Sequence, residues 1–453
     1  MDAKKILAEI RDNIEAVIRR DTPTGKSLWE ALIELHPVDI AEFLPNMSLE
    51  HAWELFRNLP KKLKLEVFEE ASDSIKVGLL EQMDDHERIE AFKALSADEI
   101  ADVFELLTDE ELKKYLNLLH KKAREKVLSL LQFPTDSAGS VMHTDVFTLM
   151  EDFTTEQSIK LLQRVRPDKD VHQKIYVTDK SDHLLGYINL QDLLLESPET
   201  RISKFMVEDR VVVRENEDQE SVAKKMVKYN LTIVPVVDKN NHFLGVIPSE
   251  TLADILVEEA GEDIQRMAAV TPLKYPYFKT SYWRILWERG YILITLLAIE
   301  SLSTMILEAN EATLTPIPLL LALVPMLISV GGNTSNQTSA IAIQGMASGE
   351  ISNNSILRFL KREFLMAAGL SFVLGLTAFM RVYFTSGRLA ASLVVSFALS
   401  IIVIVSVILG SGTPFLLRRL NLDPAFAAGP FLATVMDILG ILIYCYIVKV
   451  TLF

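Results

Sequence analysis

The chain has 453 residues, of which 49% are hydrophobic and 24% are charged, and its formal net charge is −15. This acidic excess argues against nucleic acid as a partner and favours cations, although net charge alone can also serve solubility. The single cysteine, Cys445, excludes a disulfide framework and a thiolate metal site within one chain.

The charged and the apolar residues occupy different parts of the chain. Residues 1–282 carry 36 Lys and Arg side chains against 53 Asp and Glu, whereas long apolar runs fill residues 283–453. The N-terminal segment, residues 1–20, is charged and amphipathic and lacks the apolar core of a signal peptide. We therefore expect a cytosolic, polyanionic part followed by a membrane part.

Residues 1–137 form the first predicted domain, which is all-helical. Short amphipathic stretches follow one another, and two of them match at an offset of 48 residues, as in Ser48 with Ser96 and Phe56 with Phe104. Repetition at this spacing predicts stacked helical hairpins that build a small superhelix.

Residues 138–200 and 201–258 form two predicted α/β units with the same order of elements. Each has a helix and then two β-rich runs separated by an Asp- or Asn-rich turn, and such runs are strand and hairpin signals. The runs are 174–178 and 184–188 in the first unit, and 232–237 and 243–247 in the second.

This order resembles a tandem of cystathionine-β-synthase-type (CBS) domains, which often bind adenine nucleotides or ions. In such domains a Gly, a Ser or Thr three residues later and an Asp six residues later can hold a ribose. Here Gly186 and Asp192 fit the spacing in the first unit, whereas the second unit has Thr251 in place of the acid. Asp192 is therefore a weak candidate for binding an adenine nucleotide.

An acidic segment connects the second unit to the membrane part and includes a predicted connecting helix at 259–282. Asp254, Glu259, Glu262 and Asp263 lie close together in it. Like charges at helical spacing destabilise an isolated helix, and a bound divalent cation would offset their repulsion. A solvated linker face is the alternative interpretation.

Residues 283–453 contain five apolar segments long enough to cross a bilayer as helices. With the N-terminus inside, most Arg and Lys residues of the connecting loops fall on the cytosolic side, and five spans place the C-terminus outside. The five segments lie near 286–307, 314–343, 364–384, 389–416 and 425–452.

The second span contains a run of small and polar residues, 331–339, that begins with Gly331, Gly332, Asn333 and Thr334. Such a run at membrane depth cannot face lipid, so it lines a wet cavity or is buried in protein. These four residues are candidates for lining a pore, and a helix-packing seam without a solute is the alternative.

The fifth span contains a carboxylate, Asp437. It lies 12 residues beyond Ala425, which is about 18 Å along a continuous helix and near the middle of the bilayer. A lone carboxylate there costs at least about 2.5 kcal/mol, so it should face a pore or a partner; a neutral structural Asp is the alternative. Gly429-Pro430 should disturb the helix, and Glu300 in the first span is a lower-ranked second acid.

Together these features resemble the MgtE family of magnesium channels over nearly the whole chain. The motifs that carry the resemblance are HPVDIA at 36–41, FPTDSAGSVM at 133–142, the paired CBS units, GGNT at 331–334, and DPA at 423–425 followed by Asp437. The resemblance implies a homodimer with a pore between two membrane domains, cytosolic surfaces that bind Mg²⁺, and a connecting helix that closes the pore.

The resemblance also assigns residues to these roles. The implied pore site is Asp437 with the carbonyl of Ala433 beside it, and the implied sensor residues are Asp254, Glu259, Glu262 and Asp263. The chain departs from the family pattern at Thr251, where an acid is frequent, and at the pore-lining candidate Gly429, where Asn is frequent.

We therefore expect a non-enzymatic, multi-pass protein of the cell membrane that imports Mg²⁺ and is closed by cytosolic Mg²⁺. Transport of another divalent cation, such as Mn²⁺ or Co²⁺, stays open because oxygen ligands accept all of them. A non-conducting, membrane-tethered sensor of ions or nucleotides is the second alternative. The sequence has no HExxH, GxSxG or Walker-type phosphate loop that would favour an enzyme.

Overall fold

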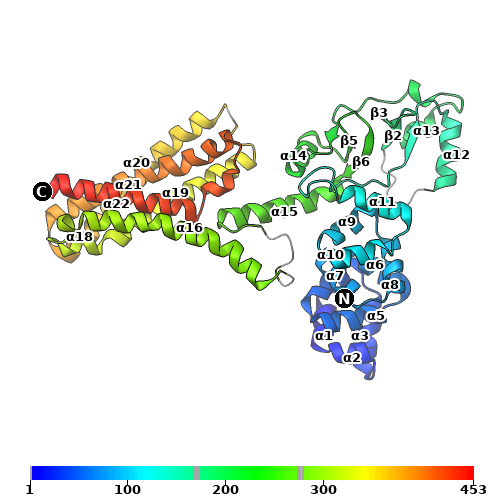
Figure 1. The fold of residues 1–453 in the computed structure, drawn as a ribbon, viewed down its shortest axis with the longest axis horizontal. Helices are drawn as coiled ribbons and strands as arrows, with labels where there is room; N and C mark the ends of the chain where they lie inside the picture. The colour runs from blue at the N-terminus through cyan, green and yellow to red at the C-terminus, as the bar shows by residue number, and fades with distance from the viewer. Residues whose placement is uncertain (1–2, 167–173, 273–276, 278–279, 353, 453) are drawn as a thin grey trace. The chain divides into compact units, whose positions relative to one another are not determined.

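A computed structural model describes residues 3–166, 174–272, 277, 280–352 and 354–452 (Figure 1). The chain divides into two compact units, Met1–Glu258 and Glu259–Phe453. The first contains a helical region and two α/β units, and the second contains long apolar helices. This is the multidomain fold class that the sequence predicts.

The helical region consists of short helices joined by tight connections, as the repeated amphipathic pattern predicts. They are α1 (Ala3–Asp12), α2 (Ile14–Arg19), α3 (Pro23–Ile33), α4 (Pro37–Phe43), η1 (Leu44–Asn46), α5 (Leu49–Asn58), α6 (Lys61–Glu70), α7 (Asp73–Gln82), α8 (Asp85–Ala94), α9 (Ala97–Glu105), α10 (Asp109–Leu116) and α11 (Lys121–Leu130).

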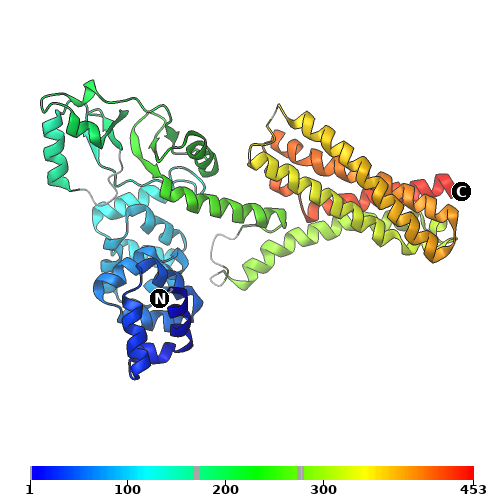
Figure 2. The ribbon, with the colours of Figure 1, turned by 180° about the vertical axis from the view of Figure 1, so that it is seen from behind.

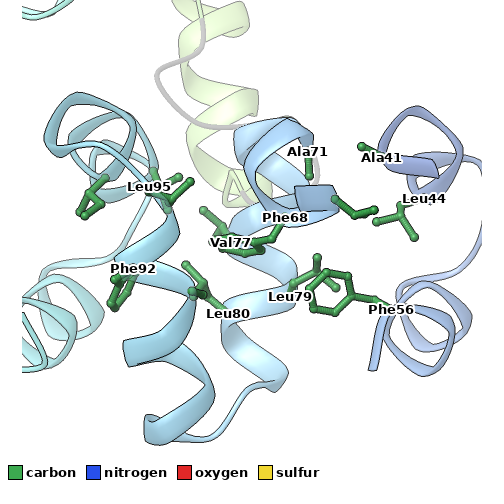
Figure 3. Packing of buried hydrophobic residues seen from close by; sticks show 14 of the residues in the cluster. Ala41, Leu44, Phe56, Phe68, Ala71, Val77, Leu79, Leu80, Phe92 and Leu95 are labelled. Carbon is green, nitrogen blue, oxygen red and sulfur yellow. The ribbon is translucent and has the colours of Figure 1, made fainter. Parts of the chain in front are cut away.

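The 48-residue repeat corresponds to equivalent helices, α5 and α9. Ser48 and Ser96 are their N-caps, and each hydroxyl accepts a hydrogen bond from the backbone N–H three residues later. Phe56 and Phe104 occupy matching buried positions. Figure 3 shows how buried side chains such as Phe56, Phe68 and Phe92 pack between successive helices. The helical hairpins thus share one continuous core.

Each α/β unit contains a three-stranded sheet in which the first strand pairs in parallel and the second and third pair antiparallel. The four longer strands fall at the predicted positions, whereas the short first strands of both sheets were not predicted. The elements are β1 (Thr148–Met150), α12 (Thr155–Val165), β2 (Lys174–Thr178), β3 (Leu184–Asn189), α13 (Leu190–Leu195), η2 (Ile202–Lys204), β4 (Val213–Arg214), α14 (Gln219–Tyr229), β5 (Ile233–Val237) and β6 (Phe243–Pro248).

The two α/β units exchange the segments that precede their sheets. His143, ahead of the first sheet, exchanges two backbone hydrogen bonds of 2.8 and 3.0 Å with Val246 of β6. Val207, ahead of the second sheet, does the same with Tyr187 of β3, at 2.8 and 2.9 Å. Each sheet is therefore completed by chain that belongs to the other unit.

The hairpin turns of the two units also meet each other. The imidazole rings of His183 and His242 stack with centroids 4.5 Å apart, and the Nδ1 atom of each ring lies within 2.9 Å of an Asp carboxylate in its own turn. The backbone N–H of Leu184 donates to the carbonyl of Asn241 at 3.0 Å. The two units are thereby joined at both ends of their third strands.

The predicted connecting segment 259–282 is partly helical. Helix α15 (Ser249–Met267) begins directly after β6 and ends within this segment, and α16 begins at Tyr282. Residues 273–276 and 278–279 of the predicted segment lie outside the described residues.

Five helices in the second unit are long and apolar enough to span a membrane, in agreement with the five predicted spans. They run side by side in Figures 1 and 2. The helices of this unit are α16 (Tyr282–Ala309), α17 (Glu311–Leu314), α18 (Pro318–Ala322), α19 (Val324–Ala347), α20 (Ile356–Ser386), α21 (Leu389–Arg419), η3 (Pro424–Ala427) and α22 (Pro430–Leu452).

The fifth span is broken at the expected place, and the break shortens the continuous helix that precedes Asp437. The short helix η3 ends at Ala427, Gly429 takes a φ of +71°, and α22 begins only at Pro430. Asp437 is therefore seven residues into α22, about 10 Å from its start, rather than twelve residues into a continuous helix from Ala425. The sequence estimate of about 18 Å assumed one continuous helix from Ala425, whereas a 3₁₀ turn and Gly429 precede α22. The position of Asp437 near the middle of the bilayer stays a prediction.

Candidate functional site

The small residues at the start of the polar run let α19 approach α22 closely. A Cβ atom at Gly332 would lie 3.6 Å from the Cβ of Ala433 and 3.9 Å from Oδ1 of Asp437. One at Gly331 would meet Ile402 and Met436. The structure thus brings four of the predicted residues, Gly331, Gly332, Ala433 and Asp437, to one contact between two helices.

A polar stripe on α19 faces away from the rest of the membrane domain. Ser329, Asn333 and Gln337 are spaced four residues apart and are all exposed. Thr334 instead is buried, and its hydroxyl donates to the carbonyl of Val330 at 2.8 Å. Among the predicted pore-lining residues, Asn333 is therefore open to an external contact, whereas Thr334 satisfies its hydroxyl within its own helix.

The break before α22 receives the C-terminal end of α15. A side chain at Gly429 would collide with the carbonyl oxygen of Met267, so the chain needs glycine here both for its positive φ and for this approach. Beside it, the Arg266 guanidinium forms ion pairs with Asp423, ahead of η3, and with Glu262, at 2.6 Å in the latter pair. We call this contact the α15 latch, and it comprises Glu262, Arg266, Met267, Asp423 and Gly429.

The predicted sensor residues all lie on α15. Asp254 is exposed, Glu259 and Asp263 are half-buried, and Glu262 is held by Arg266 as described. The carboxylate of Asp254 lies within electrostatic range of Asp73, at the start of α7. The structure therefore adds acids from the helical region that the sequence interpretation missed.

Burial raises the pKa values of acids in the helical region. Burial raises the pKa of Asp73, although Lys76, 3.6 Å away, opposes the shift. Burial likewise raises the pKa of Asp98, which is 5% exposed. Asp102 lies within electrostatic range of both. Asp98 and Asp102 are spaced four apart on α9, and this spacing was the signal available in the sequence.

His143 links Asp98 to the second α/β unit. Its Nε2 atom lies 3.4 Å from the carboxylate of Asp98 and 3.4 Å from the hydroxyl of Thr251, while Oδ1 of Asp98 is buried without a hydrogen-bond partner. Thr251 is one of the two positions at which the resemblance implies a departure from the family pattern. An imidazole thus stands between an acid of α9 and the start of α15.

Asp192, the candidate for ribose binding, serves as a helix cap. Its carboxylate accepts hydrogen bonds from the backbone and side-chain N–H groups of Asn189, at 3.2 and 3.0 Å. Gly186 and its counterpart Gly245 lack side chains because the exchanged segments pass there: a Cβ would collide with the carbonyls of Val207 and His143. Strand pairing and capping therefore account for this motif in the structure.

The contact between α19 and α22 and the acidic residues of α15 both offer oxygen ligands, which suit hard divalent cations. Within the described ranges, no three His, Cys, Asp or Glu side chains converge as a complete metal-binding group. Each place therefore offers one or a few carboxylates together with carbonyl or amide oxygens, which fits a cation that retains most of its water.

Comparison with known proteins agrees with this layout. Family models match residues 324–447 ("Divalent cation transporter", MgtE), 35–136 ("MgtE intracellular N domain"), and 138–199 and 202–258 (CBS domain). The magnesium transporter MgtE of Thermus thermophilus is 33% identical over 325 residues, 71% of either chain. That of Bacillus subtilis is 29% identical over 314 residues, 69% of either chain.

A crystal structure of the cytosolic domain of the Mg²⁺ channel MgtE in complex with ATP is also similar. It is 28% identical, with a TM-score of 0.49, and the match covers 55% of this chain and 99% of that one.

Fold, spans and comparisons define a multi-pass membrane protein with a cytoplasmic N-terminal part that contains tandem CBS domains. The chain belongs to the MgtE family of magnesium transporters.

Proposed function

We propose that this protein conducts Mg²⁺ through a pore between the membrane domains of a homodimer, with Asp437 of each subunit facing the ion. The observation that carries the proposal is the contact of Gly332, Ala433 and Asp437 beside the exposed stripe of Ser329, Asn333 and Gln337. Lipid cannot satisfy such groups, so a second subunit or water must cover them.

Mg²⁺ is small and sheds its water reluctantly, which suits this arrangement. The two Asp437 carboxylates supply the charge. The carbonyl of Ala433 accepts hydrogen bonds from the water shell, and the side-chain amide of Asn333 can donate to it or accept from it. Gly331, Gly332 and Thr334 support the site by close packing. With the N-terminus cytoplasmic, five spans place the C-terminus outside.

Cytosolic Mg²⁺ closes the pore in this proposal. A divalent cation binds among the α15 acids Asp254, Glu259, Glu262 and Asp263, and Asp254 in addition lies within electrostatic range of the acid at the start of α7. Mg²⁺ binds the closed arrangement of the protein more tightly than the open one, and it therefore shifts the population toward the closed pore. A nucleotide role for Asp192 has no support in its contacts.

The test is Mg²⁺ uptake into proteoliposomes containing the full-length protein. Asp437→Ala should abolish the flux while the protein elutes from a sizing column like the wild type, because the charge that holds the hydrated ion is lost. Uptake by this variant at the wild-type rate would refute the pore site, and competition by Mn²⁺ or Co²⁺ would reveal a broader substrate range.

A matched pair of variants separates pore effects from damage to packing. Asn333→Leu should cut the flux because it removes a polar group from the exposed stripe. Phe372→Leu, at a position of α20 that is 71% exposed, should leave the flux unchanged. Equal losses in both variants would contradict a special role for the stripe.

A further inference from the structure

Helix α16 contacts the rest of the membrane domain through one narrow face. The buried and half-buried residues on it recur at helical spacing, from Glu288 through Leu296 to Ser303 and Ile306, whereas most other side chains of the helix are exposed. This face packs on α22, the helix that carries Asp437. A protein-facing stripe in a membrane span is ordinarily apolar, yet this one contains Glu288, Glu300 and Ser303.

Glu300 lies on this stripe, half-buried, and its carboxylate is close enough to that of Asp437 for their charges to interact. The two acids come from different helices, and in the part of the chain that the structure describes neither forms an ion pair with Lys, Arg or His. Two like charges in a poorly hydrated space repel each other unless a cation or a proton lies with them.

Ser303 gives independent evidence for a bound water molecule or hydrated ion. It lies one turn beyond Glu300 on the same face and is 4% exposed, and its hydroxyl is buried without a hydrogen-bond partner. Other serines of the membrane helices donate to backbone carbonyls, as Ser301 does within its own helix to Leu297 at 2.9 Å and Ser400 does to Ser371 of the neighbouring helix α20 at 3.0 Å. A buried hydroxyl left unsatisfied one turn beyond Glu300 indicates a place for water or a hydrated ion.

We propose that Glu300 is a second carboxylate of the ion pathway, which acts with Asp437 of the same subunit on the hydrated divalent cation. Ser303 hydrogen-bonds to the water shell of that cation. The assignment rests on the proposed function and extends it to selectivity. With Glu300 the pathway of the dimer has four carboxylates, which two divalent ions neutralise, whereas four monovalent ions are needed.

The experiment measures Mg²⁺ flux into proteoliposomes against external Mg²⁺ concentration, with and without 150 mM Na⁺ as a physiological competitor (on the order of the ionic strength at which exposed charges are screened). Glu300→Gln keeps the shape and hydrogen-bonding capacity of the side chain and removes its charge. We expect the half-saturating Mg²⁺ concentration to rise at least about tenfold and Na⁺ to inhibit the variant but not the wild type.

Glu308→Gln is the matched control, because it removes the same charge from an exposed position eight residues further along α16. It should leave both measurements unchanged. Glu300→Asp should recover most of the wild-type affinity, which a merely structural role of the side chain would not predict.

The Asp437→Ala variant distinguishes a failure of the Glu300 assignment from a failure of the proposed function. If it abolishes flux while Glu300→Gln has the wild-type concentration dependence and Na⁺ response, the assignment of Glu300 is wrong and the pore site stands. If Asp437→Ala conducts normally, the proposed function itself fails. Loss of the monodisperse elution peak for Glu300→Gln alone, with Glu300→Asp unable to restore Mg²⁺ affinity, would show a structural role and also overturn the assignment.

Discussion

Glycines in this chain meet three different physical requirements. Gly332 lets two membrane helices approach, Gly186 and Gly245 let an exchanged segment pass, and Gly429 both adopts a positive φ and receives the end of α15. Only the first of these could be inferred from the sequence, because a small residue in an apolar span indicates close helix packing. The others depend on chain that lies far away in sequence.

The α15 latch gives a prediction for Gly429. Gly429→Ala should cost the positive-φ strain of about 1–2 kcal/mol and, in addition, should displace the end of α15 from η3. We expect a lower thermal midpoint and faster proteolysis near Met267. Gly387→Ala is the control, because Gly387 also has a positive φ, of +65°, but a Cβ atom there would meet no other part of the chain within 4 Å. Equal proteolysis in the two variants would show that the latch does not hold α15.

Acidic residues show how far single positions can be inferred without a structure. A carboxylate in an apolar run identifies Asp437 because its burial is costly whatever the fold. Asp73 begins an otherwise ordinary helix, so nothing local distinguishes it from a solvated charge. The four-residue spacing of Asp98 and Asp102 is a sequence signal, but it is equally typical of a solvated helix face. The pairing of Asp73 with Asp254, and of Asp98 with His143, arises from the packing of the helical region on the second α/β unit.

Among the elements, periodicity predicts those that bury one face over several turns or a full strand. It locates β2, β3, β5 and β6 and all five membrane helices. It fails for β1 and β4, which have three and two residues and pair only because the following strand offers an edge. It also misplaces the start of α22, because Pro424 is acceptable in the first turn of an α-helix and of a 3₁₀-helix alike.

The repeat in the helical region yields a prediction about two equivalent caps. Ser96 caps α9 in a capping box, in which Glu99 accepts from the backbone N–H of Ser96 at 2.7 Å, whereas Ser48 of α5 has His51 in the place of Glu99. Ser96→Ala should therefore destabilise its helix by about 1 kcal/mol and Ser48→Ala by less. Amide hydrogen exchange in α9 and α5 measures both effects, and a larger loss at Ser48 would contradict the argument.

At the scale of the whole molecule, the polyanionic cytosolic part contains acids that the fold makes harder to ionise. Burial raises the pKa values of Asp73, Asp98 and Glu258, and the carboxylates of Asp136 and Asp254 lie close to Glu258. An acid whose pKa is raised by folding binds its proton more tightly in the folded state. Its contribution to stability therefore falls as pH rises from its unfolded pKa, near 4, through its folded pKa.

We accordingly predict that the cytosolic part of the full-length protein becomes less protected from proteolysis as pH rises from 5 to 8. Asp179 and Asp238 do not oppose this trend, because their pKa values are lowered, to about 2 for Asp238, and they titrate only in stronger acid. Mg²⁺ should restore protection at pH 8, since a cation that binds the compact state stabilises it.

Two controls accompany this measurement. NaCl at matched ionic strength tests simple screening of the acids, and it should protect less than Mg²⁺. Replacement of Glu259, Glu262 and Asp263 together by Ala should weaken the effect of Mg²⁺. Protection that is the same in Mg²⁺ and in NaCl would show that the acidic surface is only solvated.

The exchanged segments at His143 and Val207 have a mechanical consequence. Neither sheet can open without breaking its pairing with the segment from the other unit. We therefore expect the two α/β units to unfold together. Pulled by its ends in an optical trap, the segment 138–258 should give one rupture with the contour length of both units rather than two smaller steps. For the same reason, deletion of either α/β unit would leave the sheet of the other unit with an unpaired edge, so neither unit can be removed alone without destabilising the other.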